Sequence, residues 1–294
     1  ARLHCSEVYS VVLNTVQGMV LLITSSDLEI RGWDWEALLA GSAEPVPVFS
    51  LQNCRTEHVR GGHPAEVNGL ALDLSCARLY AASGDGNAYG WDLASQRCVS
   101  TFTGHKDMVH CLALRPRHEQ LITGSEDSTI RLWDVRSQRC SHVLEPHKPP
   151  LTVPSDTASE PAGRWCSCLA LDESETWLAA GWGDGYLTTV ELNALTCVAC
   201  LPTAAPPQAV VFQQGSAGDL VSVGAENGVY HWKVTGELLT RATCCSPSAF
   251  ALATHGSNEQ QMVVVGGSSP FLDIFCDLSH KAVSFAVPEA PISS

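Results

Sequence analysis

A spacing that repeats along the chain constrains the fold more than any other feature of the sequence. His105 lies 28 positions before Trp133, and His63 lies 28 positions before Trp91. Each histidine follows a glycine, and each tryptophan precedes an aspartate. The step from Trp91 to Trp133 is 42 positions, and a period of this length is typical of a repeat array rather than of a single folding unit.

Weaker copies of this pattern extend the array in both directions. Residues 27–34 match residues 127–134 at five of eight positions. Further along the chain, the step from Val190 to Trp232 equals the step from Trp91 to Trp133, and the step from Trp232 to Phe275 is one position longer. The copies are therefore marked by six positions: Trp33, Trp91, Trp133, Val190, Trp232 and Phe275.

Each copy has the pattern of a small antiparallel sheet. In the copy that ends at Trp133, short apolar runs at 109–114, 121–124 and 130–135 are separated by turn residues, and a fourth alternating run follows at 140–144. Such runs predict strands joined by hairpins, and a sustained helical period is missing throughout. A four-stranded sheet of about 40 residues cannot bury both faces alone, and repetition around an axis solves this problem. The sequence therefore predicts an all-β chain that forms a β-propeller.

The paired glycine–histidine and tryptophan–aspartate motifs resemble the WD40 repeat family, and this resemblance covers essentially the whole chain. In that family a buried hydrogen-bonded tetrad links histidine, serine or threonine, aspartate and tryptophan within one blade. For the strongest copy, the resemblance implies a structural tetrad of His105, Thr123, Asp127 and Trp133.

The preceding copy is expected to hold only a partial tetrad. It has His63, Asp85 and Trp91, but Ala81 stands where the hydroxyl belongs. An alternative interpretation of His105, Asp127 and Ser125 is a hydrolase triad. The structural interpretation is preferred because the spacing recurs in the preceding copy, and because the Gly-x-Ser-x-Gly elbow of such enzymes is missing.

The number of blades is the next expectation. The family resemblance implies seven blades, whereas six copies are visible, and His4 precedes Trp33 by nearly the same step that separates His105 from Trp133. The chain thus opens at the entry loop of the first visible copy. We therefore expect a single propeller domain over residues 1–294, with six recognisable blades and an amino-terminal blade missing from this sequence.

Bulk properties exclude several classes of function. Acidic residues outnumber basic ones by 31 to 17, which gives a net charge of −14, and autonomous nucleic-acid binding needs a basic surface. No apolar run approaches the roughly 18 residues of a membrane span, and the first residues do not resemble a secretion signal. The 13 cysteines lack the paired spacing of a zinc site and are expected to be reduced thiols. We expect no catalytic activity, no cofactor, no metal and no small-molecule substrate.

Some stretches depart from the generic repeat and resemble the WD-repeat subunits of the THO complex. Residues 33–39 form a Trp-x-Trp variant of the first motif, and Gly163-Arg164-Trp165-Cys166 opens a copy where glycine–histidine is expected. Residues 104–115 and 273–285 show the same likeness. The resemblance implies a nuclear, non-catalytic scaffold that contacts other THO subunits, couples transcription and processing of messenger RNA to its export, and reaches RNA only through the complex. The alternative is another WD40 scaffold, such as the substrate receptor of a ubiquitin ligase.

Two long connections indicate where partners bind. The steps from Trp33 to Trp91 and from Trp133 to Val190 are 58 and 57 positions, against 42 from Trp91 to Trp133. A fourth strand of the first copy at 46–51 divides the first surplus between the two loops that flank it, and the second surplus falls in 146–163. The family places the loops at 52–62 and 146–163 on the narrow face of a propeller. Long loops on a rigid scaffold often carry binding residues, although the proline- and serine-rich composition of 146–163 is also typical of a solvated loop. The candidate partner-binding residues are His58, Arg60, Arg164 and Trp165.

Overall fold

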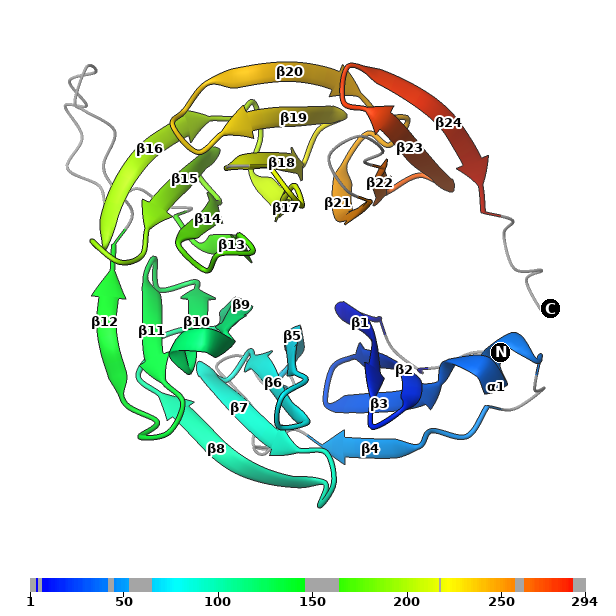
Figure 1. The fold of residues 1–294 in the computed structure, drawn as a ribbon, viewed down its shortest axis with the longest axis vertical. Helices are drawn as coiled ribbons and strands as arrows, with labels where there is room; N and C mark the ends of the chain where they lie inside the picture. The colour runs from blue at the N-terminus through cyan, green and yellow to red at the C-terminus, as the bar shows by residue number, and fades with distance from the viewer. Residues whose placement is uncertain are drawn as a thin grey trace. The chain divides into compact units, whose positions relative to one another are not determined.

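The strands of the protein form four-stranded antiparallel sheets, each built from four consecutive strands (Figure 1). The computed structural model describes residues 4, 7–41, 45–52, 65–145, 164–216, 218–256 and 262–287. Within these ranges there are six such sheets, one for each repeat of the sequence. The prediction of an all-β fold of propeller type with six recognisable blades is therefore confirmed.

The chain divides into two compact units, and the first covers Ala1–Leu144. It contains the first three blades, with neighbouring strands of each sheet in sequence order. Its strands are β1 (Ser10–Val16), β2 (Met19–Ser25), β3 (Glu29–Asp34), β4 (Phe49–Gln52), β5 (Val67–Asp73), β6 (Arg78–Ser83), β7 (Asn87–Asp92), β8 (Arg97–Thr103), β9 (Val109–Arg115), β10 (Gln120–Ser125), β11 (Ile130–Asp134) and β12 (Cys140–Leu144).

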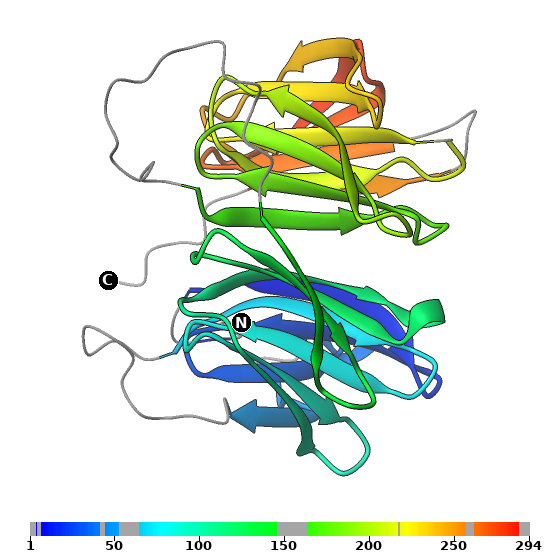
Figure 2. The ribbon, with the colours of Figure 1, turned by 90° about the vertical axis from the view of Figure 1, so that its left-hand side faces the viewer.

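The second unit covers Glu145–Ser294 and contains the last three blades. Short turns join most consecutive strands of a blade, as Figure 2 shows from the side. The strands are β13 (Cys166–Leu171), β14 (Trp177–Trp182), β15 (Tyr186–Glu191), β16 (Thr196–Pro202), β17 (Pro207–Phe212), β18 (Asp219–Gly224), β19 (Gly228–Lys233), β20 (Leu238–Thr243), β21 (Ala249–His255), β22 (Met262–Gly267), β23 (Phe271–Asp277) and β24 (His280–Ala286).

The four strands of the third blade, β9 to β12, lie close to the predicted runs. The second strand is the most buried, because Leu121, Ile122 and Thr123 are each fully inaccessible to solvent. The turn before β11 contains Ser128 in the left-handed region, with φ of 64°, in the polar segment predicted to be a turn.

The apolar core lies between consecutive blades of each unit. In the first unit, Phe102 of the second blade packs against Trp133 of the third, with ring centroids 5.9 Å apart. Hydrogen bonds also join neighbouring blades: Ser25 Oγ donates to the carbonyl of Val67 over 2.8 Å. In the second unit, Ser167 Oγ donates to the carbonyl of Pro207 over 2.5 Å. Within each unit, neighbouring blades therefore bury facing surfaces against one another, as the repeat argument requires.

Two short helices accompany the strands. The helix α1 (Trp35–Leu39) follows β3 in the first blade, and a 3-10 helix, η1 (Pro116–His118), follows β9 in the third. Asp34 caps α1 by accepting hydrogen bonds from the backbone N–H groups of Glu36 and Ala37, as N-terminal aspartates commonly do. Part of the surplus after Trp33 is this helix, and the fourth strand begins at Phe49 rather than at residue 46.

Within the described ranges, the helices are too short or too polar to cross a membrane. The single domain over residues 1–294 and the missing amino-terminal blade stay predictions.

Candidate functional site

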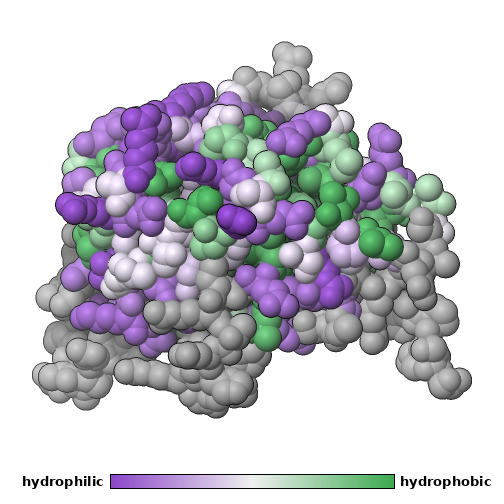
Figure 3. Space-filling view, turned by 90° about the horizontal axis from the view of Figure 1, so that it is seen from below, coloured by the Kyte–Doolittle hydropathy of each residue, from purple (hydrophilic) through white to green (hydrophobic). Residues whose placement is uncertain are grey.

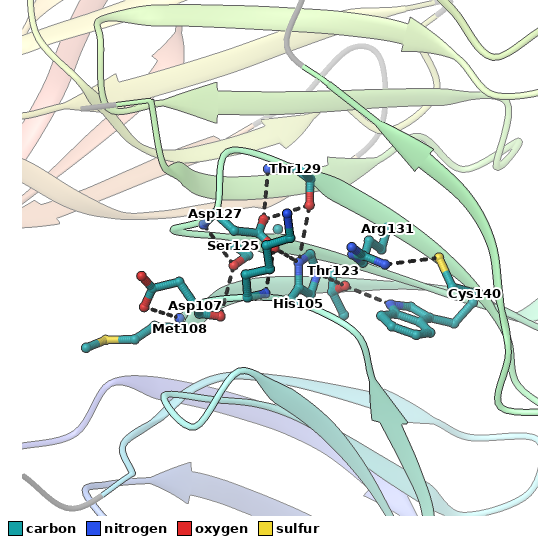
Figure 4. A network of polar contacts seen from close by, with 12 residues as sticks. His105, Asp107, Met108, Thr123, Ser125, Asp127, Thr129, Arg131 and Cys140 are labelled. Atoms are coloured by element: carbon teal, nitrogen blue, oxygen red, sulfur yellow. Dashed lines mark hydrogen bonds and ion pairs between the residues drawn. The ribbon is translucent and has the colours of Figure 1, made fainter. Parts of the chain in front are cut away.

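A chain of buried hydrogen bonds joins the four predicted tetrad residues of the third blade (Figure 4). The His105 ring lies 2.9 Å from Asp127 through Nδ1 and 2.7 Å from the hydroxyl of Thr123 through Nε2. The Trp133 indole Nε1 donates to the same hydroxyl over 2.8 Å. Thr123 thus connects the histidine to the tryptophan.

The direction of these bonds follows from the donors and acceptors available. An ionised carboxylate can only accept, so Nδ1 of His105 carries a proton and donates to Asp127. In the neutral ring, Nε2 then accepts the proton of the Thr123 hydroxyl, whose oxygen accepts the indole N–H of Trp133. Every member is paired, and a fully satisfied buried network of this kind fixes the arrangement of the elements that supply it.

The carboxylate of Asp127 holds the outer end of the network. Burial raises the pKa of Asp127, but hydrogen bonds from His105, the Thr129 hydroxyl and the backbone N–H of Lys106 outweigh burial and hold the pKa well below its usual range. The Thr129 hydroxyl donates over 2.6 Å and the Lys106 N–H over 2.9 Å. Asp127 therefore connects the loop that leads into the blade with the turn before β11.

Aromatic and cationic groups surround the inner end of the network. Trp133 is 1% exposed, and the guanidinium carbon of Arg131 lies 6.0 Å from the centre of its ring. Arg131 also donates from Nη1 to the sulfur of Cys140 over 3.8 Å. The tryptophan is thus enclosed on several sides, which is the environment of a packing residue.

The geometry argues against a hydrolase triad at this position. The hydroxyl of Ser125 donates to the carbonyl of Asp107 over 3.1 Å and accepts the backbone N–H of Asp127 over 3.1 Å. Both ring nitrogens of His105 are occupied by Asp127 and Thr123. Because a general base must reach the proton of its nucleophile, Ser125 and His105 are not arranged as a catalytic pair.

The partial tetrad of the second blade is described only at two of its three residues. His63 lies outside the described residues, and Ala81 is buried without a hydroxyl to offer. The carboxylate of Asp85 accepts a hydrogen bond from the hydroxyl of Tyr89 through Oδ2 over 2.6 Å. Trp91 is 2% exposed and belongs to the core between the first and second blades.

A network in the first blade was missed by sequence reasoning. His4 Nε2 lies 2.6 Å from the hydroxyl of Thr24, and Trp33 Nε1 donates to that hydroxyl over 2.9 Å. The carboxylate beside His4 belongs to Glu29, 3.5 Å away, and not to Asp27, which instead accepts from Tyr9. The spacing between His4 and Trp33 could have indicated this network. The same spacing does not show that Glu29, and not Asp27, lies beside the histidine.

The fourth and fifth blades replace the network by a single indole–hydroxyl bond. In the fourth blade the motif position holds Val190, and Trp182 at the end of β14 donates instead to Thr188 Oγ1 over 2.8 Å. In the fifth, Trp232 donates to Ser222 Oγ over 3.0 Å. Each of these two blades thus keeps a buried indole paired with a hydroxyl.

The candidate partner-binding residues lie only in part within the described ranges. Arg164 and Trp165 directly precede β13, and both are partly exposed. Arg164 Nε is 3.3 Å from a carboxylate oxygen of Asp184, and the Trp165 carbonyl accepts the backbone N–H of Gly183 over 2.9 Å. His58, Arg60 and the loops at 53–64 and 146–163 lie outside the described residues.

In the described part of the chain, no group of three or more His, Cys, Asp or Glu side chains is placed to hold a metal ion. The cysteines in these ranges are free thiols. Cys166 and Cys168 are buried in β13, and Cys244 is buried just after β20, which agrees with a packing role.

Comparison with known proteins identifies the repeat and the family. Residues 96–134 match the family described as WD domain, G-beta repeat. The chain is 30% identical to THO complex subunit 6 homolog of Mus musculus over 96% of its own length and 78% of that relative. It is 29% identical to THO complex subunit 6 of Arabidopsis thaliana over 90% of its length and 70% of that relative. The chain therefore belongs to the THO complex subunit 6 family and is built from WD40 repeats.

Proposed function

We propose that the protein is a non-catalytic scaffold subunit of a nuclear THO complex, within the assembly that couples transcription and processing of messenger RNA to its export. The observation that carries this proposal is the likeness to THO complex subunit 6 homolog of Mus musculus, which extends over 96% of the chain. The strongest polar constellation, around His105, is fully used in holding the third blade together. A scaffold role requires this network only to stabilise the blade.

The charge of the chain supports contact with RNA through partners only. With a net charge of −14, the protein repels a polyphosphate, whereas binding by release of counterions needs clustered lysine and arginine. On the face drawn in Figure 3, hydrophobic residues form small groups among hydrophilic ones. Mixed surfaces of this kind are typical of non-obligate protein interfaces.

We place one contact with another THO subunit at Arg164 and Trp165. Arginine and tryptophan are among the residues that most often dominate binding energy at interfaces. Both are held at the start of β13, Arg164 by Asp184 and Trp165 by the backbone of Gly183. Both residues are therefore held directly before β13, at the end of the long connection 146–163.

The test is co-purification from nuclear extract with the double variant Arg164→Glu, Trp165→Ala. A milder pair, Arg164→Gln with Trp165→Ala, avoids placing two carboxylates side by side at Asp184. The matched control is Arg136→Glu with Val143→Ala, two exposed residues of the third blade. We expect wild type and control to recover THO subunits and both Arg164 variants to lose at least one.

Two outcomes would contradict these proposals separately. If a folded Arg164 variant recovers every THO subunit in the normal ratio, the interface lies elsewhere while the scaffold role stands. If the wild-type protein recovers ubiquitin-ligase adaptors in place of THO subunits, the chain serves the alternative WD40 function.

A further inference from the structure

A cysteine and a lysine lie in direct contact in the last blade. Lys281 Nζ donates to the sulfur of Cys245 over 2.8 Å, and the hydroxyl of Ser284 lies 3.6 Å from the same sulfur. Cys245 is exposed and belongs to the segment between β20 and β21, whereas Lys281 and Ser284 belong to the outermost strand, β24. The pair thus joins the segment leading into the blade to the edge of its sheet.

A buried carboxylate contacts both the cysteine segment and the lysine. Asp273 on β23 is 1% exposed and accepts hydrogen bonds from the backbone N–H of Cys245 and the hydroxyl of Ser284. Its Oδ1 is also 3.4 Å from Lys281 Nζ. The carboxylate therefore orients the backbone of the cysteine and the ammonium of the lysine at the same time.

The cation of the last blade comes from a different strand than the cations of the first and third blades. Arg31 and Arg131 lie two residues before Trp33 and Trp133 and stand over their indole rings. In the last blade the residue two places before Phe275 is Asp273, so the cation comes from the neighbouring strand as Lys281. An acidic residue thus takes the place of the arginine, and the cation from the neighbouring strand lies against the sulfur of Cys245.

From this geometry we propose that Cys245 is a site of reversible oxidation by hydroperoxides, with Lys281 as the residue that activates its sulfur. The thiolate is the reactive form of cysteine, and a neighbouring ammonium favours it. The carboxylate of Asp273 contacts Lys281, the Ser284 hydroxyl and the backbone N–H of Cys245, and so holds the ammonium beside the sulfur. Cys245 is an exposed residue, so an oxidant can reach it.

The reaction balances with hydrogen peroxide as the oxidant. The sulfur attacks one peroxide oxygen, so that an S–O bond forms while the O–O bond breaks. Sulfur gives up two electrons and becomes a sulfenic acid. The departing hydroxide takes up the proton that the thiol has lost and leaves as water. Two equivalents of an external thiol return the sulfenic acid to the thiol through a mixed disulfide.

The hydrogen bond to Cys245 also affects the protonation of Lys281. The hydrogen bond to Cys245 is the largest of the influences that raise the pKa of Lys281, with the charge of Asp273 adding to it. The ammonium is thereby kept protonated beside the sulfur. A methionine at this position removes the charge at similar length, and an arginine keeps the charge.

The experiment measures sulfenic acid at single cysteines of the purified protein. The protein is exposed to hydrogen peroxide in the presence of dimedone, and labelling is followed by fragment-ion mass spectrometry, which separates Cys245 from the buried Cys244. Cys276, an exposed cysteine on β23 of the same blade, is the internal control. We expect Cys245 to be labelled several-fold faster than Cys276.

Two variants assign the effect to the lysine. Lys281→Met should lower the rate at Cys245 several-fold and leave that at Cys276 unchanged, whereas Lys281→Arg should retain much of the rate. Equal rates at Cys245 and Cys276 in the wild-type protein would overturn the proposal, and this comparison does not depend on the folding of any variant. An unchanged rate at Cys245 in a folded Lys281→Met protein would equally overturn it.

Discussion

Trp133 and Thr123 share a hydrogen bond 2.8 Å long in the fully buried centre of the third blade. The same hydroxyl faces His105 at 2.7 Å, so a single oxygen atom serves two neighbours. Removing that oxygen therefore affects more than one polar group, which makes Thr123 the most informative position for testing the network.

Thr123→Val keeps the shape of the side chain and removes the hydroxyl. Trp133 Nε1 and His105 Nε2 then lose their partner, and each buried polar group left unpaired costs about 1–3 kcal/mol. We expect the free energy of unfolding to fall accordingly in a urea titration. Thr101→Val, on the exposed side of β8, is the matched control and should change it little. A Thr123→Val protein as stable as this control would contradict the assigned network.

Trp133→Ala and Trp91→Ala test how much the complete network adds. Both indoles are almost fully buried, so each truncation should cost about 3–5 kcal/mol in lost packing. The loss at Trp133 should be larger, because its truncation also removes the indole N–H that the Thr123 hydroxyl accepts, whereas Ala81 offers no hydroxyl in the second blade. Thermal melts of the two variants measure the difference, and equal shifts would count against the tetrad assignment.

Repetition made most of the fold predictable from the sequence. The spacing between His105 and Trp133 recurs, so one well-formed copy supplied the strand positions for degenerate copies such as that of Phe275. The tetrad residues came from the resemblance to the WD40 family, in which each of them occupies a fixed place in the repeat. Helix α1 was not predictable, because the five residues after Asp34 are too few to show a helical period.

Other contacts depend on packing that no spacing records. Trp182 is on β14, where the repeat has no tryptophan, and its bond to Thr188 depends on the two strands lying side by side. Likewise, His4 lies beside Glu29, whereas Asp27 accepts a hydrogen bond from Tyr9. Sequence spacing fixes the position of a residue along a strand, whereas the choice between neighbouring partners is made in three dimensions.

Thr188→Val tests whether the substitute bond in the fourth blade stabilises it. Thr188 is 3% exposed and accepts the indole N–H of Trp182, so the valine variant leaves one buried donor unpaired. The expected cost is about 1–3 kcal/mol, below that of Thr123→Val, which affects two neighbours. Urea titrations of the two variants in parallel provide the comparison. A larger loss for Thr188→Val would show that the fourth blade depends on its hydroxyl more than the third does.

Asp127 should make the protein sensitive to acid. Its folded-state pKa is held below the ordinary value by His105, Thr129 and Lys106, against the effect of burial. The unfolded chain therefore takes up the proton first, near the usual pKa of about 3.9, and stability is lost as pH falls from there through the lower folded-state pKa. Asp127→Asn should be less stable than wild type at pH 7 but should lose less further stability on acidification. Parallel urea titrations from pH 7 to pH 3 measure this, and equal losses would contradict the role of Asp127.

His231 should add a second pH dependence at milder acidity. Burial lowers its pKa, and Asp219, whose carboxylate lies 3.8 Å from Nε2, raises it only in part. The folded protein thus keeps His231 neutral at a pH where the unfolded chain, with a histidine pKa of about 6.5, has begun to take up a proton. Stability is therefore present above that pH and is lost as pH falls through the lower folded-state value.

The variant His231→Phe removes this titration while it retains a ring in β19. Between pH 7.5 and pH 5.5 the wild-type protein should lose more stability than the variant. Above pH 7.5 the free energies of unfolding of the two proteins should change with pH in parallel. His4 contributes in the same direction, because burial and Arg31 lower its pKa, but it is present in both proteins and cancels in the comparison. An NMR titration that places the pKa of the His231 ring at or above that of a histidine in an unfolded peptide would refute the prediction directly.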